Sequence, residues 1–382
     1  MRVALVSGYD ARVPGGVQIQ VAGLARALSG RGVEVAVVAP RRRPDGDKGG
    51  GVEFFRAGRS YPFPANGSVA PVAPTPAAAA ATLRALGRLR PDVVHVHEPL
   101  IPGPPLAAVL LGRRPVVATF HRADADALYR AEGRLLSRAV VARIGLATAV
   151  SPAATETARA VLGPSLGEVV EVPNGVEVAR FEQAAARRRG GRPAGRYKNG
   201  PVPLVAFVGR HEERKGARLL IEAVRRLEGP MRVVVAGAGP ETDSLRRIAA
   251  GDGRVGFPGR ISDDEVADLL ASADVFVGPA TGGESFGVVL LEAMAAGTAV
   301  VASDLPGYVL AAAGAARIFE AGDPGRLAAA LAGVLGDDDE RERLVALGAA
   351  RAASCSMERV AEAYLECYQR LVGPKGTVGA GP

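Results

Sequence analysis

Short apolar runs rich in Val and Ala alternate with amphipathic helical patterns along almost the whole chain. Helical patterns such as 17–32 and 218–229 separate the apolar runs. The runs lie at 3–8, 33–40, 92–97, 116–121, 147–151, 169–173, 203–209, 232–239, 254–259, 275–280 and 299–303. Runs that are apolar throughout, without alternation, are typical of parallel strands buried on both faces. The pattern therefore predicts an α/β fold with parallel sheets between helices.

One basic, Gly- and Pro-rich segment at 186–203 interrupts this alternation. This composition predicts a linker between two Rossmann-like domains, at 1–185 and 204–356. A long amphipathic pattern at 357–372 predicts a C-terminal helix that packs back on the N-terminal domain. In such folds ligands bind beyond the carboxyl ends of the strands, so we expect a cleft between facing strand ends.

Charge is distributed unevenly along the chain. Residues 1–180 hold 22 Lys+Arg and 14 Asp+Glu, whereas residues 204–382 hold 19 and 25. A basic first half predicts contact with an anionic surface. Aromatic residues make up only 4% and Trp is absent, which argues against nucleic acid and favours anionic lipid headgroups.

Two helical patterns, 77–91 and 127–144, mix leucines with arginines as interfacial helices do. The first carries Arg84, Arg88 and Arg90. No apolar stretch is long enough to span a bilayer, and no cleavable signal is recognisable. We therefore expect a cytoplasmic protein, peripheral on the inner face of the plasma membrane. Cys355 and Cys367 lack metal-ligand spacing and are expected to be free thiols.

In the first half, candidate site residues follow the strands. Gly15 and Gly16, in VPGGVQ, let the backbone approach a ligand, and the following helix N-terminus offers N–H groups to a phosphate. His121 ends the run VVATFH at the cleft side of the domain, so we expect it to be functional. His95 and His97 are expected to be structural.

In the second half, Arg210 and Lys215 lie in GRHEERKG, a loop leading into a helix and suited to gripping a diphosphate. Lys215 is not followed by Ser or Thr, which excludes a P-loop. The segment 282–297 places Glu284 in a Gly-rich loop and Glu292 on the next helix, where carboxylates can bind separate hydroxyl groups of one ligand. No three-ligand spacing predicts a zinc site.

These segments together resemble the retaining GT-B glycosyltransferases of family 4. The resemblance covers nearly the whole chain, and the E-x7-E element of Glu284 and Glu292 is its most specific part. The shared segments are PGGVQ, VHVHEP, ATFH, VPNGV, VGRHEERKG, GGESFG…LEAMAAG and VVASDLPG. Within the family, VPGGVQ, PANGSVA and TGGESFGVVLLEAMAAGTAVVASDL most resemble the actinobacterial phosphatidylinositol mannosyltransferases.

The resemblance implies GDP-mannose as donor, a phosphatidylinositol as acceptor, and transfer with retention. Mg²⁺ is possible but not implied by the sequence. The residues implied to contact the donor are Gly16, Arg210, Lys215, Glu284, Phe286 and Glu292, and those toward the acceptor are Gln18, Asn66 and His121. His121, Arg210, Lys215 and Glu284 would act in catalysis: the cations hold the diphosphate, Glu284 the mannose hydroxyls, and His121 lies beside the C6 hydroxyl. Glu292 would bind the ribose.

The sequence leaves three alternative functions open. The chain could be a family 4 enzyme that uses another nucleotide sugar and a soluble acceptor. It could be a GT-B nucleotide-sugar epimerase, although no convincing acid–base carboxylate set is visible. It could also be a sugar-nucleotide binding module without activity, although every expected site residue is present.

Overall fold

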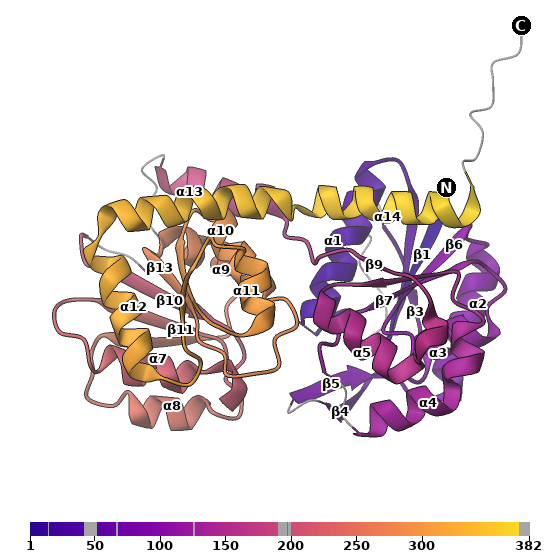
Figure 1. Ribbon diagram of the computed structural model, residues 1–382, viewed down its shortest axis with the longest axis horizontal. Helices are drawn as coiled ribbons and strands as arrows, with labels where there is room; N and C mark the ends of the chain where they lie inside the picture. Colours follow the sequence, from indigo (N-terminus) through magenta and orange to yellow (C-terminus); the bar gives the residue numbers. More distant parts are fainter. Residues whose placement is uncertain are drawn as a thin grey trace, which may run out of the picture. The chain divides into compact units, whose positions relative to one another are not determined.

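The computed structural model of the chain describes residues 1–13, 15–41, 52–65, 68–124, 127–189, 197 and 200–373. The chain folds into two compact units (Figure 1). The first consists of Met1–Gly175 and the chain from Met357 onward, and the second of Val176–Ser356. Each contains a parallel sheet with helices, so the predicted α/β class with two parallel-sheet domains is confirmed.

The sheet of the first unit has seven parallel strands. They are β1 (Arg2–Ser7), β2 (Glu34–Ala39), β3 (Glu53–Arg56), β6 (Val93–His97), β7 (Val116–Phe120), β8 (Leu146–Ala149) and β9 (Val169–Glu171). Their order is β3-β2-β1-β6-β7-β8-β9. Strands β6 and β7 are buried along their whole length because helices cover both faces. A separate antiparallel hairpin consists of β4 (Tyr61–Ala65) and β5 (Ser68–Val72).

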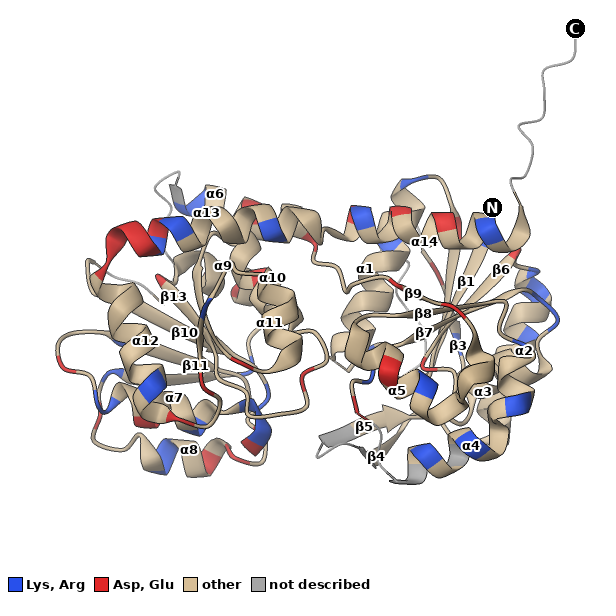
Figure 2. Cartoon of the chain, viewed as in Figure 1, with Lys and Arg blue, Asp and Glu red and all other residues tan. Residues whose placement is uncertain are grey.

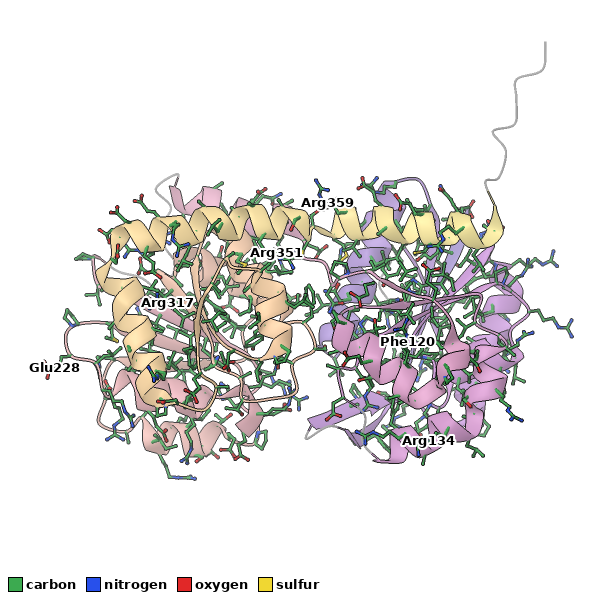
Figure 3. All side chains as sticks on the ribbon, in the orientation of Figure 1. Phe120, Arg134, Glu228, Arg317, Arg351 and Arg359 are labelled. Carbon is green, nitrogen blue, oxygen red and sulfur yellow. The ribbon has the colours of Figure 1, made fainter. Side chains whose placement is uncertain are left out.

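The helices of the first unit cover both faces of this sheet. They are α1 (Gly16–Gly30), α2 (Pro76–Leu89), α3 (Pro104–Leu111), α4 (Ala127–Val141), α5 (Pro152–Leu162), the short 3-10 helix η1 (Pro164–Leu166) and α14 (Met357–Val372). Residues from α1 and α14 share a core with Val3, Leu5 and Val93. Residues from α2 to α5 share the other core with Val94 and Val96, on the opposite side of β6. Phe120, labelled in Figure 3, belongs to this second core.

Helix α14 docks on the first unit through polar as well as apolar contacts. The Tyr368 hydroxyl lies 2.7 Å from Nδ1 of His95. The Tyr364 hydroxyl lies 3.2 Å from Oγ1 of Thr119. The helix approaches α1 so closely that a Cβ at Gly23 would lie 2.6 Å from Cε of Met357. This is the amphipathic C-terminal helix that the sequence pattern predicts.

The second unit contains a six-stranded parallel sheet. Its strands are β10 (Leu204–Val208), β11 (Arg232–Ala236), β12 (Val255–Gly259), β13 (Val275–Gly278), β14 (Ala299–Ser303) and β15 (Arg317–Phe319). Their order is β12-β11-β10-β13-β14-β15. The helices are α6 (Val178–Arg189), the short 3-10 helix η2 (Glu213–Lys215), α7 (Ala217–Val224), α8 (Thr242–Ile248), α9 (Asp263–Ser272), α10 (Val288–Ala295), α11 (Pro306–Ala312), α12 (Pro324–Gly336) and α13 (Asp338–Ser354).

The border between the units lies earlier than the position 185 expected from the sequence. It falls between Gly175 and Val176, because α6 packs on the second unit, where Arg187 pairs with Asp268 at 2.8 Å. Within the segment read as a linker, Tyr197 is buried in the core of the second unit. Counted by unit, the first holds 24 Lys+Arg against 16 Asp+Glu and the second 23 against 24. The first unit keeps its positive excess, but the second is close to neutral.

Both sheets reverse their strand order at one point. The reversal lies between β1 and β6 in the first unit and between β10 and β13 in the second. Loops that leave two such strands at their carboxyl ends diverge to opposite faces of the sheet and leave a crevice for a ligand. Each unit therefore positions a candidate site at this edge.

Candidate active site

The loop between β1 and α1 holds the paired glycines of the first unit. Gly15 precedes the first turn of α1, and a Cβ there would lie 2.4 Å from Oε1 of Gln18. Gly15 has an extended backbone with φ of −174°, so another residue would only have to displace the end of the Gln18 side chain. A Cβ at Gly16 would meet nothing within 4 Å, and Gly16 is exposed. The free N–H groups of the first turn can thus be approached by an anion.

The predicted acceptor residues Gln18 and Asn66 come from two separate segments of the first unit. Gln18 lies in the first turn of α1, half-buried beside Gly15. Asn66, between β4 and β5, lies outside the described residues.

His121 follows β7 directly and is almost completely buried. Its Nε2 lies 2.9 Å from Nδ1 of His97, and the two rings are stacked with centroids 5.2 Å apart. Burial lowers the pKa of His121 to about 4, because an imidazolium loses its hydration there. The pKa of His97 is lowered for the same reason, with His95 and His121 adding to the effect. Both rings are therefore neutral near pH 7.

Glu98, which the sequence analysis did not single out, holds His121 in place. Its carboxyl group is completely buried and accepts a 2.6 Å hydrogen bond from the backbone N–H of His121 and a 3.1 Å bond from the Tyr129 hydroxyl. Burial raises its pKa, while Arg122 opposes the shift. Its φ of 57° is in the left-handed region, where a residue with a Cβ is strained. Buried ionisable residues with a strained backbone at a strand end cluster at functional sites, which makes Glu98 a candidate for one.

The second unit brings Arg210, Lys215 and Glu284 into one cluster of charges. Lys215 and Arg214 both contact Oε1 of Glu284, Arg214 at 3.2 Å. Glu212 pairs with Arg210 at 2.9 Å and with Arg214 at 3.0 Å. Three cations against two carboxylates leave one excess positive charge. The bridging pair Glu212 and Arg214 was not predicted, because the sequence does not fix the loop conformation that turns both side chains inward.

The cluster is assembled by the loops after β10 and β13, the two strands at the reversal point. Gly216 joins them: its φ is 71°, and a Cβ there would lie 1.9 Å from the carbonyl oxygen of Pro279. Only glycine fits this close approach. The Thr281 N–H donates to the carbonyl of Arg214 at 2.8 Å, which holds the second loop against the first.

Glu292 and Phe286 lie further along the segment after β13. Glu292 is half-buried on α10, and burial raises its pKa to about 7, with Arg180 opposing the shift and Asp263 and Glu177 adding to it. The Phe286 side chain is buried in the core, so that only its backbone can reach a ligand.

The remaining histidines have internal partners. His95 lies between the Tyr368 hydroxyl and Thr119, whose Oγ1 is 2.6 Å from Nε2. His211 is fully buried, with Nδ1 2.9 Å from Oγ1 of Thr242.

Among the described residues, no group of three or more His, Cys, Asp or Glu could hold a metal ion. Within the same residues, no helix is long and apolar enough to cross a membrane.

The two sets of site residues offer different chemistry. The second unit presents cations held by carboxylates, which can bind a diphosphate and stabilise charge as it develops there. The first unit presents neutral rings and a helix N-terminus, which can orient an uncharged polyol and a phosphate. The sequence-predicted residues Gly16, Gln18 and His121 belong to the first unit, whereas Arg210, Lys215, Glu284, Phe286 and Glu292 belong to the second.

Two family models match the chain, one to each half. "Glycosyltransferase Family 4" matches residues 14–180, and "Glycosyl transferases group 1" matches residues 202–337. The phosphatidyl-myo-inositol mannosyltransferase of Mycolicibacterium smegmatis is 37% identical over 98% of this chain and 95% of its own length. The protein of the same name from Propionibacterium freudenreichii is 38% identical over 81% of this chain and 78% of its own.

Solved structures agree on the fold. Sucrose-phosphate synthase from Thermosynechococcus elongatus superposes with a TM-score of 0.74 at 20% identity, covering 97% of this chain and 98% of that one. HepE from Anabaena in complex with UDP gives 0.73 at 18% identity, covering 97% and 100%. With the identity over nearly its full length and the matches to both halves, the chain belongs to the family 4 glycosyltransferases of the GT-B fold.

Proposed function

We propose that the enzyme transfers α-mannose from GDP-mannose to phosphatidylinositol, with retention of configuration. The observation that carries the proposal is the 37% identity over 98% of the chain to a phosphatidyl-myo-inositol mannosyltransferase. The charged cluster of the second unit supports it, because it supplies what a nucleotide-diphosphate leaving group needs. In this proposal Glu292 accepts hydrogen bonds from the ribose, and Gly16 N–H approaches the donor phosphates.

Departure of the nucleotide diphosphate is the step that the second unit assists. As the bond between the sugar C1 and the phosphate oxygen breaks, negative charge grows on the β-phosphate. Lys215 and Arg210 stabilise that charge. In this proposal their positive charges do what a bound metal ion does in other phosphate sites. Their partners Glu284 and Glu212 hold the cations in position before the donor arrives. Glu284 then orients the sugar through its hydroxyl groups.

Retention requires the acceptor to attack the face that the leaving group vacates. Glu98, the carboxyl group next to His121, is fully buried and both of its oxygens accept hydrogen bonds, so it is not available as a covalent nucleophile. We infer front-face attack. The acceptor oxygen bonds to C1 as the phosphate leaves, and a β-phosphate oxygen accepts the acceptor's proton. Closure of the enzyme would exclude water, which otherwise hydrolyses the donor.

A lipid acceptor requires a surface that meets anionic headgroups, and the exposed side chains of α4 support such a surface on the first unit. Figure 2 shows basic residues along α4 and α2. On α4, Leu135 is 84% exposed beside the exposed Arg134, labelled in Figure 3, and Arg138 follows one turn later. An exposed leucine flanked by arginines is typical of interfacial helices. Tyr61 and Phe63 of the β4–β5 hairpin are also exposed.

The other predicted interfacial helix, α2, has a different surface. Leu86 and Leu89 are buried in the core of the unit and Leu83 is half-buried, so none of its leucines is exposed as Leu135 is. Arg84, Arg88 and Arg90 remain exposed. In our proposal α2 contributes only charge to membrane attachment, whereas α4 contributes both charge and an apolar side chain, at the inner face of the membrane.

The test is an assay of the full chain with a panel of GDP-mannose, GDP-glucose and UDP-glucose against phosphatidylinositol in vesicles and against free inositol phosphate. We expect one hexose to be added to phosphatidylinositol from GDP-mannose, with the α-anomer established by NMR. A product only with the soluble acceptor, or only from another nucleotide sugar, would overturn the substrate assignment. Conversion of the nucleotide sugar itself without acceptor would point to an epimerase. Glu284→Ala is the control for a contaminating activity.

A further inference from the structure

The contact between His97 and His121 constrains where their protons lie. Nδ1 of His97 and Nε2 of His121 are 2.9 Å apart, a hydrogen-bond distance. Because burial keeps both rings neutral, each carries one proton, and one ring must donate to the other. Two arrangements satisfy this. Either His97 donates from Nδ1, or His121 donates from Nε2.

The second nitrogen of His97 distinguishes the two arrangements. Its Nε2 is buried and has no hydrogen-bond partner in the described part of the chain. If His121 were the donor, His97 would carry its proton on Nε2, and a buried N–H would be left without an acceptor. If His97 is the donor, its Nε2 carries no proton, and only an acceptor lone pair is left without a partner. Buried N–H groups without a partner are the rarer and costlier case.

We propose that His97 is a positioning residue that fixes His121 in the tautomer protonated at Nδ1, so that His121 presents an N–H donor to the substrate. The backbone on either side is held as well. Glu98 accepts from the His121 N–H at 2.6 Å, and the N–H of Glu98 donates to the carbonyl of Thr119 at 2.9 Å. The ring of His121 is therefore fixed in both position and protonation.

The consequence for catalysis rests on the proposed function, in which His121 lies beside the transferred sugar. A neutral N–H donor orients a sugar hydroxyl without adding charge. An imidazolium at the same place would oppose the positive charge that develops at C1, and in a poorly solvated site this repulsion is only weakly screened. A neutral ring with a fixed tautomer supplies direction without that repulsion.

The tautomer can be read directly, without an activity measurement. The chain has four histidines, so long-range ¹H–¹⁵N spectra of the ¹⁵N-histidine-labelled protein near pH 7 can be assigned by single substitutions. We expect His121 to be protonated at Nδ1. In His97→Phe, which keeps a ring but removes both nitrogens, His121 should shift toward the Nε2-protonated form. In His97→Asn, the amide N–H can replace the Nδ1 donor, and the wild-type tautomer should return.

His95→Gln is the matched control, because His95 is on the same strand but bonds Tyr368 and Thr119 rather than His121. It should leave the His121 tautomer unchanged. An Nε2-protonated His121 in the wild-type protein would overturn the inference, as would an unchanged tautomer in His97→Phe. If His97→Phe does not fold, the wild-type spectrum alone still decides.

Kinetics separate this inference from the proposed function. His97→Phe should lower kcat on the order of tenfold with the affinity for GDP unchanged, and His97→Asn should recover most of the loss. A wild-type enzyme with the Nδ1 tautomer that does not use GDP-mannose would overturn the proposed function and leave the inference standing. Mannosyl transfer by an enzyme with the Nε2 tautomer would do the opposite.

Discussion

The candidate site residues of the two units lie in opposite electrostatic environments. In the first unit, His97 and His121 are buried and their pKa values are lowered, so they are uncharged. In the second unit, Lys215, Arg214 and Glu284 form ion pairs at a partly exposed edge. Both sites lie at the same topological position, the carboxyl ends of strands beside a reversal in strand order. The shared fold thus gives both units a candidate site at the same place, and the local side chains make one site charged and the other uncharged.

The largest effect should come from the charged cluster. We expect Glu284→Ala and Lys215→Ala each to lower kcat/KM by on the order of 10²-fold or more, because charge-assisted contacts count most in the transition state. Steady-state assays with the donor and acceptor provide the measurement. Glu213→Ala is the matched control, since Glu213 is exposed on the same turn, η2, and should turn over normally. Near-normal turnover of Glu284→Ala would remove the cluster from the active site.

The next largest effect should be on binding to acidic liposomes, for which the basic first unit is compared with the nearly neutral second unit. The double change Arg134→Ala and Arg138→Ala on α4 should weaken binding to acidic liposomes roughly 30-fold, at about 1 kcal/mol for each arginine. Flotation at low and high salt measures it, and binding of wild type should fall with salt because exposed charges are screened. The control pair Arg246→Ala and Arg247→Ala, exposed on α8 of the second unit, should bind as wild type.

Equal loss of binding for both pairs would show that only net charge matters and that no surface of the first unit is specific. Binding that ignores both lipid charge and salt would favour a soluble acceptor.

The third prediction concerns the buried carboxyl group of the first unit. Glu98→Ala should lower the free energy of unfolding by about 1–3 kcal/mol, because the N–H of His121 and the hydroxyl of Tyr129 lose their acceptor. Glu98→Gly loses the same bonds but tolerates the φ of 57°, so it should be about 1 kcal/mol more stable than the alanine variant. Urea unfolding of the three proteins gives the comparison. Equal stability of the two variants would mean that the backbone at 98 relaxes.

The smallest effect is a pH dependence of the GDP affinity, which should arise from Glu292 in the second unit. Burial raises the pKa of Glu292 to about 7. In the proposed function ribose hydroxyls donate hydrogen bonds to this carboxyl group, and its ionised form would accept them best. The affinity for GDP should therefore fall as the pH is lowered from 8 to 6, by up to about tenfold. Calorimetry with GDP alone measures it. Glu292→Gln should bind weakly at both pH values. His121 stays neutral across this window, since its pKa is about 4.

If the pH dependence of GDP affinity persists in Glu292→Gln, another group is responsible and Glu292 is not the ribose ligand. Unchanged affinity in Glu292→Ala would lead to the same conclusion.

The strands that sequence reasoning missed share a physical cause. The predicted apolar runs include the central strands, such as β6 and β13, which are buried on both faces. They also include the edge strands β9 and β12, whose sequences VVE and VGFPG keep a recognisable apolar run. The missed strands β3 and β15 lie at sheet edges, and their residues are largely exposed. The hairpin β4–β5 contains two prolines in one strand and pairs outside the main sheets. These missed strands are short or contain prolines and charged residues, so they lack the apolar run by which a strand is recognised in the sequence.

The sequence by itself determined the α/β class, the two sheets and the C-terminal helix, because each depends on local periodicity and on apolar runs. Its motifs also indicated the family, and they predicted Arg210, Lys215, Glu284 and His121 as site residues. Only the tertiary structure decided which groups these residues meet. The ion pair between Glu212 and Arg214 depends on the conformation of one loop. The hydrogen bond from the His121 N–H to Glu98 depends on the pairing of β6 with β7, which brings together residues that are separate in the sequence. The protonation of the histidines likewise follows from burial, which no local pattern specifies.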